Sequence, residues 1–153
     1  MIIKSLEHLN FFSKKIAENL LKPDCVLLFG EIGVGKTTFT RNLINYLQKR
    51  ENIKLTEVLS PTFNLLYEYE FSAFKVMHYD LYRLKSVKET RQLGIFNEKD
   101  SSIKIIEWPE LIKDNVADKI ELKFSHSKKK DERNETRKNG YELVFIPQIC
   151  LFS

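Results

Sequence analysis

The sequence is poor in cysteine and has no long hydrophobic run. Only Cys25 and Cys150 occur among 153 residues, which argues against a fold held by several disulfides and fits a reducing cytosol, although one disulfide stays compatible with the sequence. No apolar stretch approaches the ~20 residues that a membrane-spanning helix needs. The N-terminal stretch MIIKSLEHLNFF carries acidic and polar residues and makes a poor signal peptide. We therefore expect a cytoplasmic protein without a membrane segment.

Length and composition fit an ordinary globular domain. Hydrophobic residues make up 42% of the chain and charged residues 30%, so we expect residues 1–153 to form one domain with a substantial core. The net charge of +4 permits an RNA or an anionic protein as a partner, but does not require either.

Glycine is also scarce, yet three of the five glycines lie in the stretch GEIGVGKTTF. Gly30, Gly35, Lys36 and Thr37 complete the pattern G-x-x-x-x-G-K-[ST], the Walker A phosphate loop. Glycines let backbone N–H groups face phosphate oxygens, the lysine brings charge to the outer phosphates, and the threonine offers a hydroxyl to Mg²⁺. The residues expected to contact nucleotide in this loop are Gly30, Glu31, Gly33, Val34, Gly35, Lys36, Thr37 and Thr38.

The pattern of apolar residues around this loop predicts an α/β fold. Helices are expected over residues 5–21, 36–50 and 86–94, and the continuous apolar run CVLLF predicts a strand buried on both sides. The further expected strands are 62–71 paired with 73–81, 102–108, and an antiparallel pair 118–125 with 140–146. Together they predict a P-loop NTPase-like three-layer sandwich, with a mostly parallel central sheet and antiparallel C-terminal strands.

Nucleotide hydrolysis needs a carboxylate near Mg²⁺ as well as the phosphate loop. Glu107 ends the apolar strand IKIIE, where the C-terminal edge of a parallel sheet would place it beside the loop. Asp80 ends the strand FKVMHYD. We expect a metal role for Glu107 and a catalytic or metal role for Asp80, although strand-end acids are often merely exposed.

Three nearby side chains allow two interpretations each. Arg83 either neutralises charge on the transferred phosphate or forms a structural salt bridge. A lone histidine in a strand, His78, is more often a satisfied core group than a general base. Trp108 is either a buried indole or an aromatic wall beside the nucleotide. ATP is favoured over GTP because the chain lacks N-K-x-D and a D-x-x-G switch after Asp80.

Four motifs occur in order between positions 30 and 110, namely GEIGVGKTTFTR, SPTFNLLYEYE, HYDLYRL and IKIIEWPE. Together they resemble the TsaE (YjeE) family of small bacterial P-loop ATPases over roughly residues 1 to 125. The resemblance implies that Lys36 and Thr37 contact phosphate and Mg²⁺ and that Thr62 lies near the γ-phosphate. It further implies that Asp80 is needed for hydrolysis and that Glu107 is a second Mg²⁺ contact with Trp108 as its aromatic neighbour.

The resemblance also implies a use for the nucleotide. The family assists synthesis of threonylcarbamoyladenosine, a modified base beside the tRNA anticodon, and docks on a TsaB–TsaD complex in which TsaD is the transferase. A TsaE-like protein would be a weak ATPase and a monomer on its own, it would reset that complex between turnovers, and it would meet tRNA indirectly or weakly.

Two features depart from the family pattern. Asn64 stands where the family usually has a hydroxyl residue. We therefore do not expect its side chain to make the contact that the hydroxyl makes in the family. The loop 126–139 in the C-terminal hairpin is long and charged, with a net charge of +3 over residues 126–138. A solvated loop is the plainer interpretation, and contact with tRNA phosphates or an acidic partner is the sharper one.

Two other functions compete with the ATPase subunit. One is a small P-loop kinase acting on a metabolite. Such kinases usually have an arginine-rich lid over the acceptor, but the arginine-bearing insertion here, residues 126–138, lies near the wrong end of the chain for that lid. The other is a nucleotide-sensing binding module without useful hydrolysis.

Overall fold

One seven-stranded sheet runs through the protein, for which a computed structural model describes residues 2–3, 5–20, 24–96, 101–126 and 141–146. The elements in chain order are β1 (Ile2–Ile3), α1 (Leu6–Asn19), β2 (Asp24–Phe29), α2 (Lys36–Arg50), β3 (Leu66–Glu70), β4 (Lys75–Asp80), α3 (Val87–Gln92), β5 (Ser102–Glu107), the 3₁₀ helix η1 (Pro109–Leu111), β6 (Ile120–His126) and β7 (Tyr141–Ile146).

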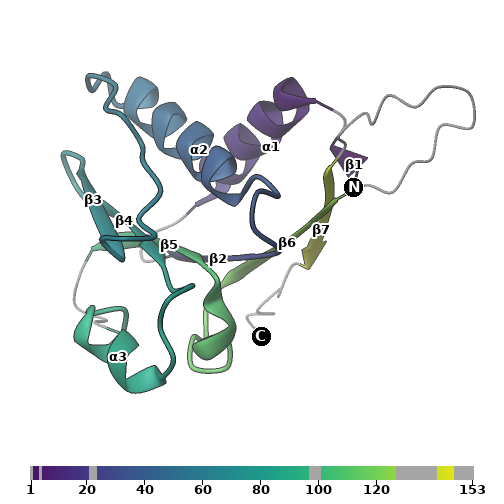
Figure 1. The fold of residues 1–153 in the computed structure, drawn as a ribbon. Coiled ribbons are helices and arrows are strands. Elements are labelled where there is room, and N and C mark those ends of the chain that lie inside the picture. Colours follow the sequence, from purple (N-terminus) through teal and green to yellow (C-terminus); the bar gives the residue numbers. More distant parts are fainter. Residues whose placement is uncertain (1, 4, 21–23, 97–100, 127–140, 147–153) are drawn as a thin grey trace, which may run out of the picture.

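The sheet has the order β1-β7-β6-β2-β5-β4-β3. Its central strands β6, β2, β5 and β4 are parallel to one another, whereas β3, β7 and β1 pair antiparallel with their neighbours. Helices α1 and α2 lie on one face of the sheet and α3 on the other (Figure 1). The predicted three-layer α/β fold is therefore confirmed, including the antiparallel C-terminal pair. The β3–β4 hairpin also forms, but its first strand begins at Leu66 rather than at residue 62, because residues 62–65 form a turn that ends with Leu65 at positive φ.

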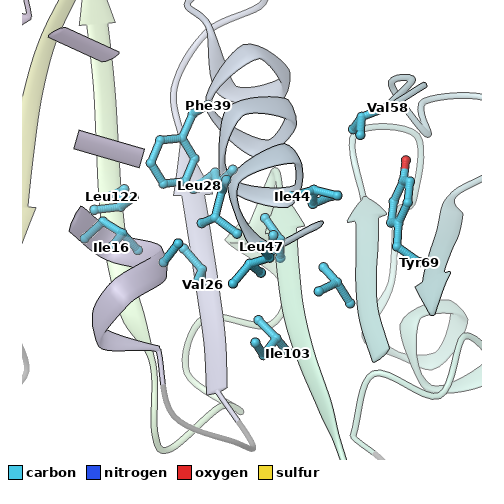
Figure 2. Close-up of a cluster of buried hydrophobic side chains, with 14 of the residues drawn as sticks. Ile16, Val26, Leu28, Phe39, Ile44, Leu47, Val58, Tyr69, Ile103 and Leu122 are labelled. Carbon is cyan, nitrogen blue, oxygen red and sulfur yellow. The ribbon is translucent and has the colours of Figure 1, made fainter. Parts of the chain in front are cut away.

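Strand β2 is buried on both faces, as its continuous apolar run predicted. Val26 and Leu28 pack into the cluster beneath α1 and α2, while Leu27 packs into the cluster on the α3 side. On the helix side, Phe39 and Leu47 of α2 reach down toward β2 and β5 (Figure 2). This packing fixes where β2 ends and α2 begins, and so it fixes the loop between them.

The helices begin with the caps that their sequences supply. The Ser5 hydroxyl accepts a hydrogen bond from the His8 N–H at the start of α1. Ser86 and Glu89 form a reciprocal capping box at the start of α3, which ends before Gly94 at φ +71°. Helix α2 differs, because its N-cap is Gly35 and no side chain caps its first N–H groups.

One apolar residue at the start of α1 is not buried. Leu9 and Ile16 are buried, but Leu6 is 65% exposed. The reason is that Leu6 lies in the first turn and lines an open groove, whose α2 wall carries the polar residues Asn42 and Asn45. The charged loop of residues 127–139 lies outside the described residues, and the organisation of residues 1–153 as one domain stays a prediction.

Candidate functional site

The phosphate loop connects β2 to α2 and contains three glycines with positive φ. Gly30 has φ +136°, Gly33 has φ +78° and Gly35 has φ +103°, conformations that side chains with a Cβ rarely adopt. The glycines serve different purposes. A Cβ on Gly30 would lie 2.4 Å from the backbone oxygen of Phe124 in β6, whereas a Cβ on Gly33 would meet no atom within 4 Å. The first glycine lets β6 approach the loop, and the second faces open space.

Lys36 begins α2, and its side chain folds back over the loop. Its Nζ donates hydrogen bonds to the carbonyl oxygens of Gly30 at 2.6 Å and Glu31 at 2.9 Å. The same ammonium lies 4.0 Å from the ring centroid of Trp108, a cation–π contact. Burial lowers the pKa of Lys36 below its ordinary value, and the charges of Glu107, Asp80 and Glu110 oppose that shift. The loop therefore holds a desolvated cation beside acids and an aromatic face.

The two candidate acids lie side by side at the carboxyl edge of the sheet. Asp80 and Glu107 end the parallel strands β4 and β5, and they are register partners. Both are buried, with 2% and 3% of their surface exposed. The Thr37 hydroxyl donates to Oε2 of Glu107 at 3.1 Å. The strand-end reasoning thus placed Glu107 correctly beside the phosphate loop.

Asp80 makes a different set of contacts. Its Oδ2 accepts a hydrogen bond from the Thr62 hydroxyl at 2.6 Å, and its Oδ1 accepts one from the Tyr82 N–H at 2.9 Å. The Thr62 hydroxyl also lies 2.9 Å from the hydroxyl of Ser60. Asp80 therefore ties the segment that contains Thr62 to the end of β4, whereas Glu107 is the acid that contacts the phosphate loop.

His78 lies beneath both acids and was not assigned to the site from sequence. Its ring is fully buried, and its Nε2 lies 2.9 Å from Oε1 of Glu107. The only sequence signal was its position two residues before Asp80, which puts both side chains on one face of β4. As expected, His78 is a buried group with a partner, and that partner is a site residue.

A cavity of about 330 Å³ lies at the mouth of the loop. Its lining residues are Ile32, Gly33, Gly35, Lys36, Thr37, Thr38, Ser60, Thr62, Asp80, Tyr82, Glu107 and Trp108. Nine of these were expected from sequence, and Ile32, Ser60 and Tyr82 were missed. Tyr82 stacks at a tilt on Trp108, with 4.8 Å between ring centroids, and forms an aromatic wall with it.

Other predicted residues lie outside the lining. Val34 is fully buried in the core beneath the loop, and Glu31 is exposed and contributes a carbonyl rather than its carboxylate. Arg83 is exposed too, and its guanidinium lies over the ring of Phe63 at 5.7 Å. Asn64 donates to the Tyr67 hydroxyl at 2.8 Å instead of pointing into the cavity.

The geometry fits a triphosphate with a hard divalent cation. The open space at Gly33 and the uncapped N-terminus of α2 leave N–H groups available for an anion. The oxygen groups of Thr37 and Glu107 are of the type that Mg²⁺ prefers, because that ion is usually bound by one or two carboxylates together with phosphate oxygens. The residues present therefore suit a nucleotide–magnesium complex.

A family model described as threonylcarbamoyl adenosine biosynthesis protein TsaE matches residues 3–138. This chain belongs to the TsaE family. The match reaches beyond the motifs themselves and into the charged C-terminal hairpin loop.

Relatives within the family carry the same description. The protein named tRNA threonylcarbamoyladenosine biosynthesis protein TsaE from Rickettsia conorii is 44% identical over 111 residues, which span 72% of this chain and 61% of the relative. Its namesake from Haemophilus influenzae is 40% identical over 107 residues, spanning 65% of this chain and 63% of the relative. The chain thus spans less than two thirds of the length of these curated relatives.

A solved structure has the same fold. The crystal structure of YdiB from Bacillus subtilis superposes with a TM-score of 0.61, covering 95% of this chain and 82% of YdiB at 23% identity. In the part of this chain that the structure describes, no helix is long and apolar enough to cross a membrane.

Proposed function

We propose that this protein binds ATP with Mg²⁺ and hydrolyses it as an accessory subunit of the machinery that makes threonylcarbamoyladenosine in tRNA. The observation that carries the proposal is the 3.1 Å hydrogen bond between Thr37 and Glu107. It joins the threonine of the phosphate loop to an acid from another strand, and those two groups are what a nucleotide-bound Mg²⁺ needs. The names of the relatives support the tRNA modification pathway as the setting.

Each side chain of the phosphate loop has a defined task in this proposal. Lys36 leaves the carbonyls of Gly30 and Glu31 and moves its charge to the β- and γ-phosphates. Thr37 and Glu107 hold Mg²⁺, which when bound neutralises charge on the phosphate oxygens. The N–H groups at the start of α2 cradle the phosphates, and the dipole of that helix favours their negative charge.

Asp80 and Thr62 act beside Glu107, at the end of the neighbouring strand β4. Asp80 accepts a hydrogen bond from the Thr62 hydroxyl, which holds the segment around Thr62 at the cavity wall, and we assign its carboxylate to orienting the attacking water. These roles explain why an acid that does not contact the phosphate loop is nevertheless buried in the cavity wall.

In this proposal, ATP hydrolysis drives a change in a protein partner rather than a reaction of a second substrate. The chain docks on a TsaB–TsaD heterodimer and resets it between turnovers, while TsaD carries out the transfer. A nucleotide cavity of about 330 Å³ then suffices, because this chain does not have to bind a second substrate itself.

Binding and turnover are measured on the purified full chain. Trp108 is the only tryptophan and contacts Lys36, so its fluorescence should change when ATP and Mg²⁺ bind. The chain alone should release phosphate slowly, and it should co-migrate with a TsaB–TsaD pair in an ATP-dependent way. A chain that neither binds ATP with Mg²⁺ nor co-migrates with that pair rules the proposal out. A metabolite that becomes phosphorylated and accelerates ADP formation would instead support the kinase alternative.

A further inference from the structure

We propose that His78 is a positioning residue that fixes the carboxylate of Glu107 so that one of its oxygens is reserved for Mg²⁺. The inference rests on the proposed function, because it concerns the cation that accompanies the nucleotide. It assigns a task to a buried polar side chain that touches neither the phosphate loop nor the cavity.

The contact between the two side chains is short and fully enclosed. His78 Nε2 lies 2.9 Å from Glu107 Oε1, and the side chains are 0% and 3% exposed. The two residues come from the neighbouring parallel strands β4 and β5, whose ladder holds their backbones in fixed register. Bulk water does not reach the fully buried His78 ring and so does not compete for this hydrogen bond.

The two oxygens of Glu107 therefore have separate partners. Oε1 lies 2.9 Å from His78 Nε2, and Oε2 accepts a hydrogen bond from the Thr37 hydroxyl at 3.1 Å. A carboxylate held at one oxygen cannot rotate both oxygens toward the cation, so it presents a single oxygen in a constant direction. Mg²⁺ is the ion for which this matters most, since it demands near-ideal octahedral geometry.

The surroundings of the imidazole indicate which nitrogen carries the proton. Because a carboxylate only accepts hydrogen bonds, Nε2 is the donor to Glu107. In the described part of the chain, the buried Nδ1 of His78 has no hydrogen-bond partner. A proton on Nδ1 would thus be a buried donor without an acceptor, which is costly. These contacts assign Nε2 as the nitrogen whose N–H donates to Glu107.

The binding experiment compares two variants of His78 in the full-length chain. His78→Leu removes the hydrogen-bond donor and puts an apolar side chain of similar bulk in its place. His78→Gln retains an N–H group that can reach Glu107. Ser102→Ala is the matched control, because Ser102 is buried at the far end of β5 and its hydroxyl has no partner among the described residues. Trp108 fluorescence is followed while Mg²⁺ is titrated at fixed ATP, and again with ATP and a chelator.

The expected result is specific to the cation. His78→Leu should raise the Mg²⁺ concentration for half-maximal binding about tenfold and leave binding of metal-free ATP within about twofold of wild type. His78→Gln should recover most of the loss, and Ser102→Ala should match wild type. An unchanged Mg²⁺ requirement in His78→Leu, or an equal loss with and without Mg²⁺, overturns the inference. If wild type itself fails to bind ATP, the proposed function has failed as well.

A second measurement needs neither a variant nor a nucleotide, and applies even if His78→Leu does not fold. The chain has three histidines, and His8 and His126 are both exposed. Nitrogen-15 chemical shifts of the imidazoles should show the buried ring of His78 as the Nε2–H tautomer. Finding the Nδ1–H tautomer at His78 overturns the inference, because the ring would then have no proton to donate to Glu107.

Discussion

Replacing two glycines of the phosphate loop, one at a time, should separate folding from nucleotide binding. At Gly30 the new Cβ would lie 2.4 Å from the backbone oxygen of Phe124, whereas ordinary contacts begin at 3.4 Å. Phe124 belongs to β6, which is paired with β2 on one side and β7 on the other, so its backbone cannot retreat easily. At Gly33 the new Cβ meets nothing within 4 Å and projects into the space that we assign to phosphate.

The expected costs differ by a few kcal/mol. Positive φ alone costs a residue with a Cβ about 1–2 kcal/mol, and part of this is offset by the lower entropy of alanine in the unfolded chain. Gly33→Ala should therefore lose about 1 kcal/mol of unfolding free energy. Gly30→Ala adds the clash with Phe124 and should lose about 3 kcal/mol or more. At about 2–4 °C per kcal/mol for a chain of this size, the two melting temperatures should differ clearly.

Thermal unfolding by circular dichroism and ATP binding by Trp108 fluorescence test this pair of variants together. Gly33→Ala should fold nearly as well as wild type yet bind ATP at least about tenfold more weakly, which corresponds to about 1.4 kcal/mol. Gly30→Ala should show the larger loss of stability. Equal melting temperatures for the two variants, or wild-type ATP affinity in Gly33→Ala, would refute the reasoning.

Three other predictions concern the charged and hydroxyl groups of the site. Thr37→Ala should raise the Mg²⁺ requirement for ATP binding about tenfold, and Thr37→Ser should restore it; an unchanged requirement in Thr37→Ala contradicts a metal role. Asp80→Asn should keep ATP binding within about twofold but lower phosphate release at least about 100-fold, with exposed Asp114→Asn as the control; wild-type turnover in Asp80→Asn would leave binding alone as the function. Burial lowers the pKa of Lys36 from its ordinary value of 10.5. As pH rises, the free protein therefore loses the charge of this lysine earlier than an exposed lysine would, and ATP affinity measured by calorimetry should fall as pH rises through the lowered pKa. Lys36→Ala should bind weakly and lack this pH dependence, and an affinity that stays flat up to pH 10.5 would contradict it.

The sequence determined the phosphate loop and its neighbours. A glycine pattern between an apolar strand and an amphipathic helix has few structural solutions, and the positive φ of Gly30, Gly33 and Gly35 agrees with it. The position of Glu107 was predictable for a similar reason, since parallel strands end at a common edge. Its role at Mg²⁺ and that of Asp80 stay predictions.

Tertiary structure alone decided how the site residues are paired. Thr62 contacts Asp80, and His78 contacts Glu107, across 18 and 29 positions of the chain. Periodicity places a side chain on a face of its own strand, but it does not say which strand becomes the neighbour or in which register. The different duties of Gly30 and Gly33 depend on the approach of β6, which arrives about ninety residues later in the chain. Local sequence fixes a conformation, whereas contacts between distant segments exist only once the sheet order β6-β2-β5-β4 has formed.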